Sequence, residues 1–199
     1  MNIAAEERKE IEFVAWVEHF LQQAYDEAKL AYEETQRLIK MGVKNLLMIH
    51  SQQMYYLVVQ HLTNAIRACE NSLEDCYKME VFSKALARHI PKIRGVVNIK
   101  ELEYEDRIVI KDGLHMETLI NNLVKPLLSD AQKFMLAASK AAAAQNPNAL
   151  AIEFNNAEER VRFAMIRLEK MIQVCKQMIT IDKQVMAETS RVGKPVYMG

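Results

Sequence analysis

The sequence predicts an all-α protein, an antiparallel bundle of four long helical segments, on three observations. Its 199 residues include only five glycines and four prolines, so long stretches contain no helix-breaking residue. Within those stretches apolar residues recur every three or four positions, the spacing that gathers them on one face of a helix. Half of the residues are apolar and 26% are charged, a composition typical of a globular chain.

The first predicted helix covers residues 3–40 and carries a seven-residue apolar repeat, the pattern of helical bundles and coiled coils. Met41-Gly42-Val43 predicts a short connection, so the next helix should return beside the first. The repeat forms two adjacent rows, Val14, Leu21, Ala28 and Thr35 in one and Val17, Ala24, Ala31 and Leu38 in the other.

The second predicted helical segment begins near residue 44 and continues to about Ile90. Its run 54–59 is apolar on all sides, which indicates a central helix, although a strand is the alternative because Tyr and Val favour sheets. Ser72 and Asp75 resemble a capping box, which predicts a break or kink there. The apolar seam of this segment includes Tyr55, Val58, Leu62, Ala65, Cys69 and Cys76.

The rest of the chain predicts an excursion and two further helical segments. Residues 91–113 contain short β-branched runs and predict an irregular or β-ribbon excursion. In segment 114–145, Pro126 predicts a kink or a new helix start. Asn146-Pro147 resembles a cap followed by a first helical residue, and the last helix should extend to about Arg191. We expect one domain over 1–191 and a flexible tail over 192–199, because the composition nowhere changes character.

The sequence lacks the familiar signatures of catalysis and of metal binding. It has no Gly-x-Gly-x-x-Gly, no Walker loop and no Gly-x-Ser-x-Gly. None of its five histidines has Glu three positions before it, the spacing of di-iron bundles, and no Cys-x-x-Cys pair occurs. We therefore expect no enzyme activity, no cofactor and no metal, and the three cysteines should be reduced core residues.

Charge and hydropathy bear on location and partners. Twenty-six basic residues balance 26 acidic ones, which argues against a nucleic-acid partner. No apolar run reaches 18 residues and the first residues do not resemble a secretory signal, so we expect a cytoplasmic protein.

The leading functional hypothesis is a non-catalytic protein–protein interaction or assembly protein, an adaptor, chaperone or structural component that acts through its helix faces and forms homo-oligomers. Basic residues without acidic neighbours, methionines one heptad apart and an alanine-rich run supply its candidate surfaces. These candidates are Lys84, Arg88, Lys92, Arg94 and Lys100, then Met171 and Met178, and finally Ala137 and Ala141.

Two other hypotheses stay open. In one, the bundle binds a small ligand or cofactor between its helices through His50, His61, Tyr55 and Tyr56. In the other, the basic stretch 84–100 binds an anionic membrane surface or an acidic partner, although pairing of these charges with the acidic first helix is the simpler explanation.

Overall fold

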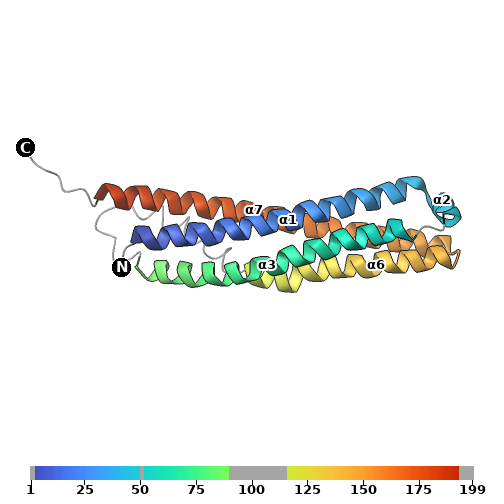
Figure 1. Ribbon diagram of the computed structural model, residues 1–199, viewed down its shortest axis with the longest axis horizontal. Helices are drawn as coiled ribbons and strands as arrows, with labels where there is room; N and C mark the ends of the chain where they lie inside the picture. Colours follow the sequence, from blue (N-terminus) through green and yellow to red (C-terminus); the bar gives the residue numbers. More distant parts are fainter. Residues whose placement is uncertain (1–2, 50–51, 90–115, 193–199) are drawn as a thin grey trace, which may run out of the picture. The chain divides into compact units, whose positions relative to one another are not determined.

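The protein is all-α in the residues that the computed structural model describes, 3–49, 52–89 and 116–192, and no strand occurs in these ranges. This confirms the predicted fold class. The predicted excursion at 91–113, and the tail after Val192, lie outside the described residues. The helices are α1 (Ile3–Met41), α2 (Val43–Met48), α3 (Gln53–His89), α5 (Met116–Leu119), a π-helical turn (Ile120–Val124), α6 (Lys125–Ala143) and α7 (Pro147–Val192) (Figure 1).

The chain divides into two compact units. Unit 1 comprises Met1–His19, Ser72–Glu117 and Met171–Gly199, and unit 2 comprises Phe20–Asn71 and Thr118–Lys170. The helices α1, α3 and α7 contribute residues to both units, whereas α6 lies wholly in unit 2. The prediction of a single domain over 1–191 stays a prediction.

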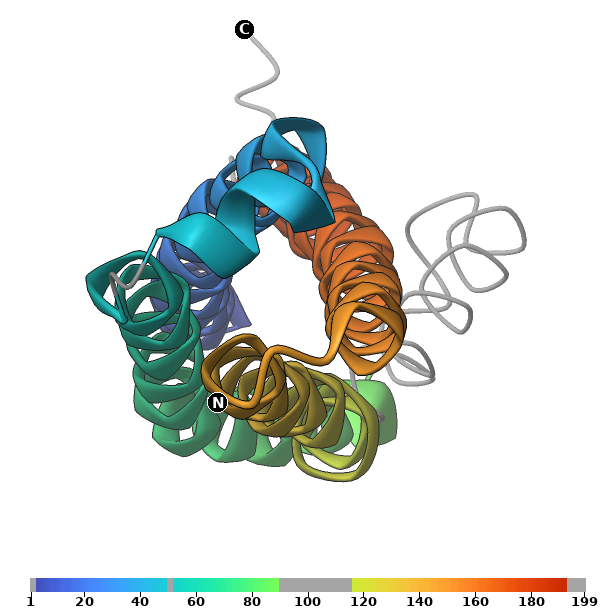
Figure 2. The same ribbon diagram turned by 90° about the vertical axis from the view of Figure 1, so that its right-hand side faces the viewer.

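In unit 2, stretches of α1, α3, α6 and α7 surround a common centre in that order, as the end-on view of Figure 2 shows. Two contacts fix α3 and α6 as antiparallel. Lys125 Nζ lies 3.2 Å from Glu70 Oε1, and seven residues further along α6 the Gln132 amide donates a hydrogen bond of 2.7 Å to Thr63 Oγ1. Residue numbers thus rise along one helix as they fall along the other.

The core of unit 2 includes the predicted rows of α1 from Leu21 to Leu38 and the predicted seam of α3 from Tyr55 to Cys69. These α1 rows are fully buried, and α3, α6 and α7 present equivalent rows; in α6 and α7 alanine alternates with larger residues. Small side chains let neighbouring helices approach closely. The buried set includes Leu21, Ala24, Ala28, Ala31, Leu38, Val58, Leu62, Ala65, Leu128, Ala131, Met135, Ala138, Phe154, Ala157, Val161, Ala164 and Leu168.

Unit 1 continues the same rows with a methionine- and cysteine-rich core. Cys76, Met79, Met116 and Cys175 are all buried, and the Cys175 Sγ lies 3.8 Å from the Met116 Sδ. Unbranched Met side chains fill irregular space of this kind.

Met171 and Met178 belong to this core, so their predicted role as a surface for partners is wrong. Their side chains are 3% and 2% exposed. The seam of α7 steps by three and four residues from Leu168 through Met171 and Cys175 to Met178. The apolar seam that the sequence predicts for this helix passes through Leu168, Ile172 and Cys175, which places Met171 and Met178 beside the seam instead of on it.

Of the break or kink predicted near residue 72, the break does not occur, because α3 is continuous from Gln53 to His89. Ser72 is fully buried between Cys69 and Cys76 on the core face. The three-residue spacing of Ser72 and Asp75 therefore reflects an ordinary helix interior, in which no glycine or proline interrupts the backbone hydrogen bonds.

The predicted helix boundaries at Gly42 and Asn146 are confirmed. Gly42 ends α1 with a positive φ of 81°. Asn146 Oδ1 accepts a hydrogen bond of 3.1 Å from the Ala149 amide at the start of α7. Between α6 and α7, Gln145 takes a φ of 55° and donates its side-chain amide to the Leu47 carbonyl at 3.0 Å, which ties this turn to α2.

Pro126 lies in the first turn of α6, which begins at Lys125, so the predicted helix start at this proline is confirmed, although the chain is already helical before it. The amide of Lys125 donates to the Ile120 carbonyl, five residues back, within the π-helical turn. Proline has no amide hydrogen, so the ordinary bond to a carbonyl four residues back is lost, and the wider turn keeps the backbone helical up to the start of α6.

Candidate functional site

The structure describes three of the four residues that the ligand hypothesis joined, and it gives them different surroundings. His61 Nδ1 lies 2.7 Å from Glu27 Oε2, a contact between α3 and α1, and the Asn64 amide lies 3.4 Å from the same oxygen. Tyr55 is buried and Tyr56 is exposed to solvent. His50 lies outside the described residues. Of the three described residues, Tyr55 alone lines the cavity of unit 2 described next.

A cavity of about 240 Å³ lies in unit 2 where α2 and the residues after it meet the start of α3 and the end of α6. The hydrogen bond from Gln145 to Leu47 and the contact of α2 with α6 hold this wall in place. None of the residues that the structure places around it is charged. The lining consists of Leu47, Ile49, Gln52, Tyr55, Ser139, Ala142 and Ala143.

The hydroxyl group of Tyr55 is a buried polar group at this cavity. Its ring stacks on Phe154, with centroids 5.9 Å apart and planes 7° from parallel, and its residue is 3% exposed. Its buried hydroxyl makes no hydrogen bond within the described chain. Burial also raises the pKa of this phenol above its ordinary value, so it remains a neutral hydrogen-bond donor. The site thus suits an uncharged molecule that carries an acceptor.

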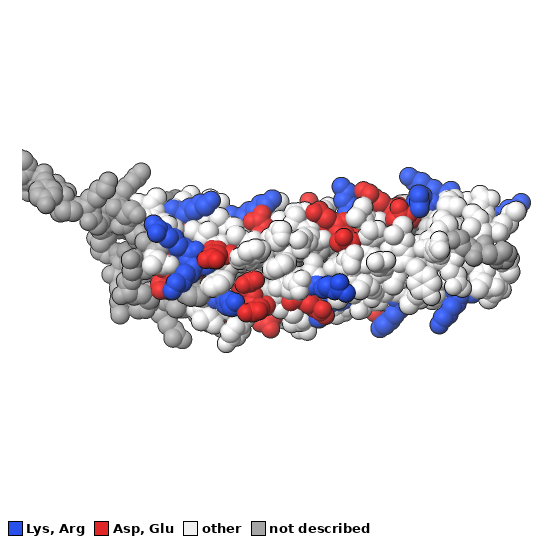
Figure 3. Space-filling model, in the orientation of Figure 1, with Lys and Arg blue, Asp and Glu red and all other residues white. Residues whose placement is uncertain are grey.

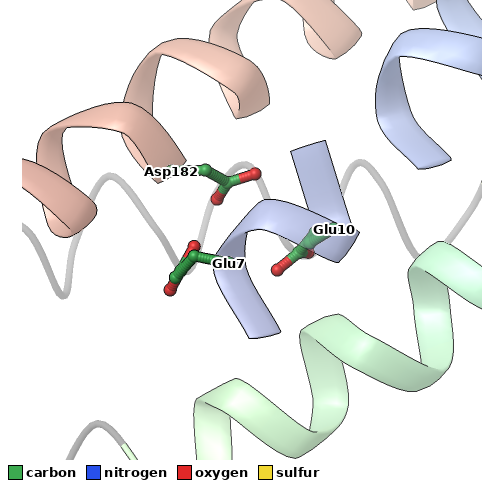
Figure 4. A group of neighbouring side chains, drawn as sticks. All are labelled: Glu7, Glu10 and Asp182. Carbon is green, nitrogen blue, oxygen red and sulfur yellow. The ribbon is translucent and has the colours of Figure 1, made fainter. Parts of the chain in front are cut away.

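A second polar cluster lies in unit 1, where Glu7 and Glu10 of α1 face Asp182 of α7 (Figure 4). One carboxylate oxygen of each residue lies within 4.8 Å of those of the other two, and the side chains are buried or nearly so. Carboxylate oxygens are the ligands that hard cations prefer. Among the described residues this group could hold a metal ion, although each side chain already takes part in an interaction within the protein.

Sequence reasoning missed this acidic cluster because it searched for metal sites through histidine and cysteine. The signal was present in the repeat itself. Glu7 and Glu10 stand seven residues before Val14 and Val17, and Asp182 stands seven residues after Cys175. All three acids therefore occupy positions that the repeat assigns to the core.

The three cysteines are buried and free. Burial raises the pKa of the Cys69 thiol to about 12, and it raises the pKa of the Cys175 thiol as well. Because the thiolate is the reactive form, neither thiol is suited to nucleophilic chemistry near neutral pH.

Four of the predicted interaction residues have side chains that the structure describes, and none of these four is an exposed surface group. Met171 and Met178 are core residues, Ala141 is buried and Ala137 is half-buried, so the alanine run serves packing between helices. The side chains of Lys84 and Arg88, and the residues Lys92, Arg94 and Lys100, lie outside what the structure describes.

Sequence reasoning also missed an outward-facing stripe on α7. Phe163 and Ile166 are 38% and 51% exposed, on the side of α7 opposite the core residues Val161 and Leu168. Glu159 and Lys170 extend the stripe at helical spacing, four residues on either side. The sequence carries this order of one acidic, two apolar and one basic residue at spacings of three and four, so an inspection of the outer face of the predicted helix would have found it.

Comparison of the chain with protein-family models, with curated proteins and with solved structures finds no match. None of the helices in the described part of the chain contains a stretch long and apolar enough to cross a membrane.

Proposed function

We propose that this protein is a non-catalytic interaction protein, and that one of its partners is a second copy of itself bound through the outer stripe of α7. The single observation that supports the proposal most is the chemical order Glu159, Phe163, Ile166, Lys170 along the outer face of α7, where Glu159 is half-buried and the other three residues are exposed.

The stripe is self-complementary when two copies of α7 pair antiparallel. A two-fold axis between Phe163 and Ile166 places Phe163 of each copy opposite Ile166 of the other copy. The same axis sets Glu159 against Lys170 of the partner, once on each side. Opposite charges then flank a small apolar centre, which favours antiparallel over parallel pairing because parallel pairing would set like charges together.

The size of the stripe limits the strength of the contact. The exposed parts of Phe163 and Ile166 amount to on the order of 200 Å² per chain, against about 800 Å² per partner in a standard stable interface. We therefore expect weak, reversible dimerisation that becomes visible at high micromolar protein concentration.

Sedimentation velocity over a concentration series tests the proposal. The average sedimentation coefficient should rise with concentration, and the double variant Phe163→Gln/Ile166→Gln should remain monomeric throughout. The matched control Leu30→Gln/Tyr56→Gln removes exposed apolar side chains from other helices and should associate like the parent.

Charge reversal gives an independent measurement. Glu159→Lys and Lys170→Glu should each weaken association, because like charges then meet across the axis. The double variant Glu159→Lys/Lys170→Glu should restore it, because every cross-axis pair is again of opposite sign. A monomer at all concentrations, or a double variant as weak as the singles, would refute pairing through this stripe.

A second candidate function is binding of a small neutral ligand in the Tyr55 cavity. Its volume of about 240 Å³ exceeds the ~150 Å³ that accommodates benzene in an engineered protein cavity. Benzyl alcohol and benzamide are suitable probes, and either should raise the melting temperature of the parent. Ala142→Leu, which fills the cavity, should abolish that shift, and an unchanged shift in this variant would contradict binding there.

A further inference from the structure

The α2 end of unit 2 combines positive charge with exposed apolar side chains. It comprises the last residues of α1, the helix α2, the first residues of α3 and α7, and the last turns of α6. Residues 35–49, 52–62 and 131–152 form this end, and the sequence contains no Asp or Glu over 35–62 or 131–152. They contain five basic residues, Arg37, Lys40, Lys44, Lys133 and Lys140.

Three of these cations are available to a partner. Lys40, Lys44 and Lys140 are exposed and form no ion pair within the residues that the structure describes. By contrast, Arg37 pairs with Glu34 at 2.7 Å, and Lys133 lies 3.7 Å from Asp130. On the face drawn in Figure 3, the α2 end shows blue side chains among white ones and no red.

Apolar side chains occupy the same end. Met48, the last residue of α2, is 73% exposed, and Ile49 beside it is also exposed. Tyr56 and Leu57 add exposed aromatic and aliphatic surface on the first turns of α3. Exposed large apolar groups among lysines and without acids are the composition of a membrane-surface anchor.

We propose that the α2 end is a docking surface for a membrane that carries anionic lipid headgroups. Met48 and Ile49 enter the headgroup region, while Lys40, Lys44 and Lys140 lie over lipid phosphates. Tyr56 is the kind of amphipathic aromatic that gathers at the membrane–water interface. The lysines come from three different helical segments of a folded unit, so docking requires no unfolding and no membrane-spanning helix.

Flotation of the full chain with vesicles tests this docking. Vesicles of phosphatidylcholine with about one third phosphatidylserine should carry the protein at 0.1 M salt, and vesicles of phosphatidylcholine alone should carry much less. The triple variant Lys40→Gln/Lys44→Gln/Lys140→Gln should bind the anionic vesicles about 100-fold more weakly, since each lysine near such a surface contributes about fivefold. Met48→Gln should weaken binding about tenfold at unchanged charge.

The matched control is Lys29→Gln/Arg67→Gln/Arg167→Gln, which removes three exposed positive charges from unit 2 outside the α2 end. It should keep most of the binding. Equal losses in the two triple variants would overturn the proposal, because attraction would then depend on overall charge alone. Absence of flotation with anionic vesicles would overturn it as well, and would direct attention to an acidic protein as the partner. The variant Phe163→Gln/Ile166→Gln should float like the parent, so vesicle binding and self-association fail or succeed separately.

Discussion

Replacement of Gly42 by alanine should destabilise the protein, although the added methyl group meets no other atom. Gly42 holds φ 81° and ψ 145° between α1 and α2. Residues with side chains avoid this region, and such backbone strain costs about 1–3 kcal/mol. A Cβ at this position would have nothing within 4 Å, so steric overlap contributes nothing and the full loss is backbone strain.

The sign of the stability change shows whether φ at Gly42 is positive, because Gly→Ala at an ordinary negative φ stabilises a protein by about 0.4–1 kcal/mol. For a chain of this length, a loss of 1–3 kcal/mol lowers the melting temperature by roughly 2–12 °C. Thermal and urea unfolding followed by circular dichroism at 222 nm would measure it. Lys44→Ala, at an exposed position of α2, is the control and should change stability by no more than about 0.5 kcal/mol. A Gly42→Ala variant as stable as the parent, or more stable, would refute the positive φ.

Three further predictions concern capping and buried polar groups. Asn146→Ala should lower the free energy of unfolding by about 1 kcal/mol in urea titrations, whereas Asn146→Asp, which keeps the capping oxygen, should not. Tyr55→Phe should raise the free energy of unfolding by about 1 kcal/mol, because it removes a buried hydroxyl that makes no hydrogen bond in the described chain; a loss of similar size would show that the hydroxyl is satisfied. The raised pKa of Cys69 predicts that the protein loses stability at alkaline pH. The thiol stays protonated in the folded state up to about pH 12, but it ionises above about pH 9 in the unfolded state. Its contribution to the free energy of unfolding is therefore complete below pH 9 and is lost between pH 9 and 12. Urea titrations at pH 8 to 11 should show a slope of up to about 1.4 kcal/mol per pH unit from this thiol, absent in Cys69→Ala.

The periodic part of the fold was predictable because burial in a helical bundle follows a simple geometric rule. Positions seven residues apart return to almost the same side of a helix, so Val14, Leu21 and Ala28 share a face in any packing. Gly42 and Asn146-Pro147 were predictable for a local reason, since their backbone chemistry ends or begins helices without help from the rest of the chain.

The sequence predictions were wrong or incomplete where packing between helices, and not the local residue types, determines the structure. Ser72 and Asp75 have the residue types of a capping box, yet Ser72 is buried on the seam and α3 continues through it. Met171 and Met178 were assigned to the surface because the predicted seam of the last helix was placed one residue away from them. One residue corresponds to a rotation of about 100° around the helix axis. The cavity beside Tyr55 depends on how α2 folds against α6, a long-range contact that no local pattern specifies.

The unbroken repeat in α7 makes this helix sensitive to the length of its chain. Its core residues follow steps of three and four from Phe154 to Met178, without a stutter that could absorb an error. Insertion of one residue after Ala157 would turn every later side chain by about 100°, and Leu168 would face water while a charged neighbour entered the interior. An insertion of seven residues would leave each side chain on its own face. Natural length variants of this helix should therefore differ by whole heptads, because only insertions or deletions of seven residues keep every later side chain on its own face.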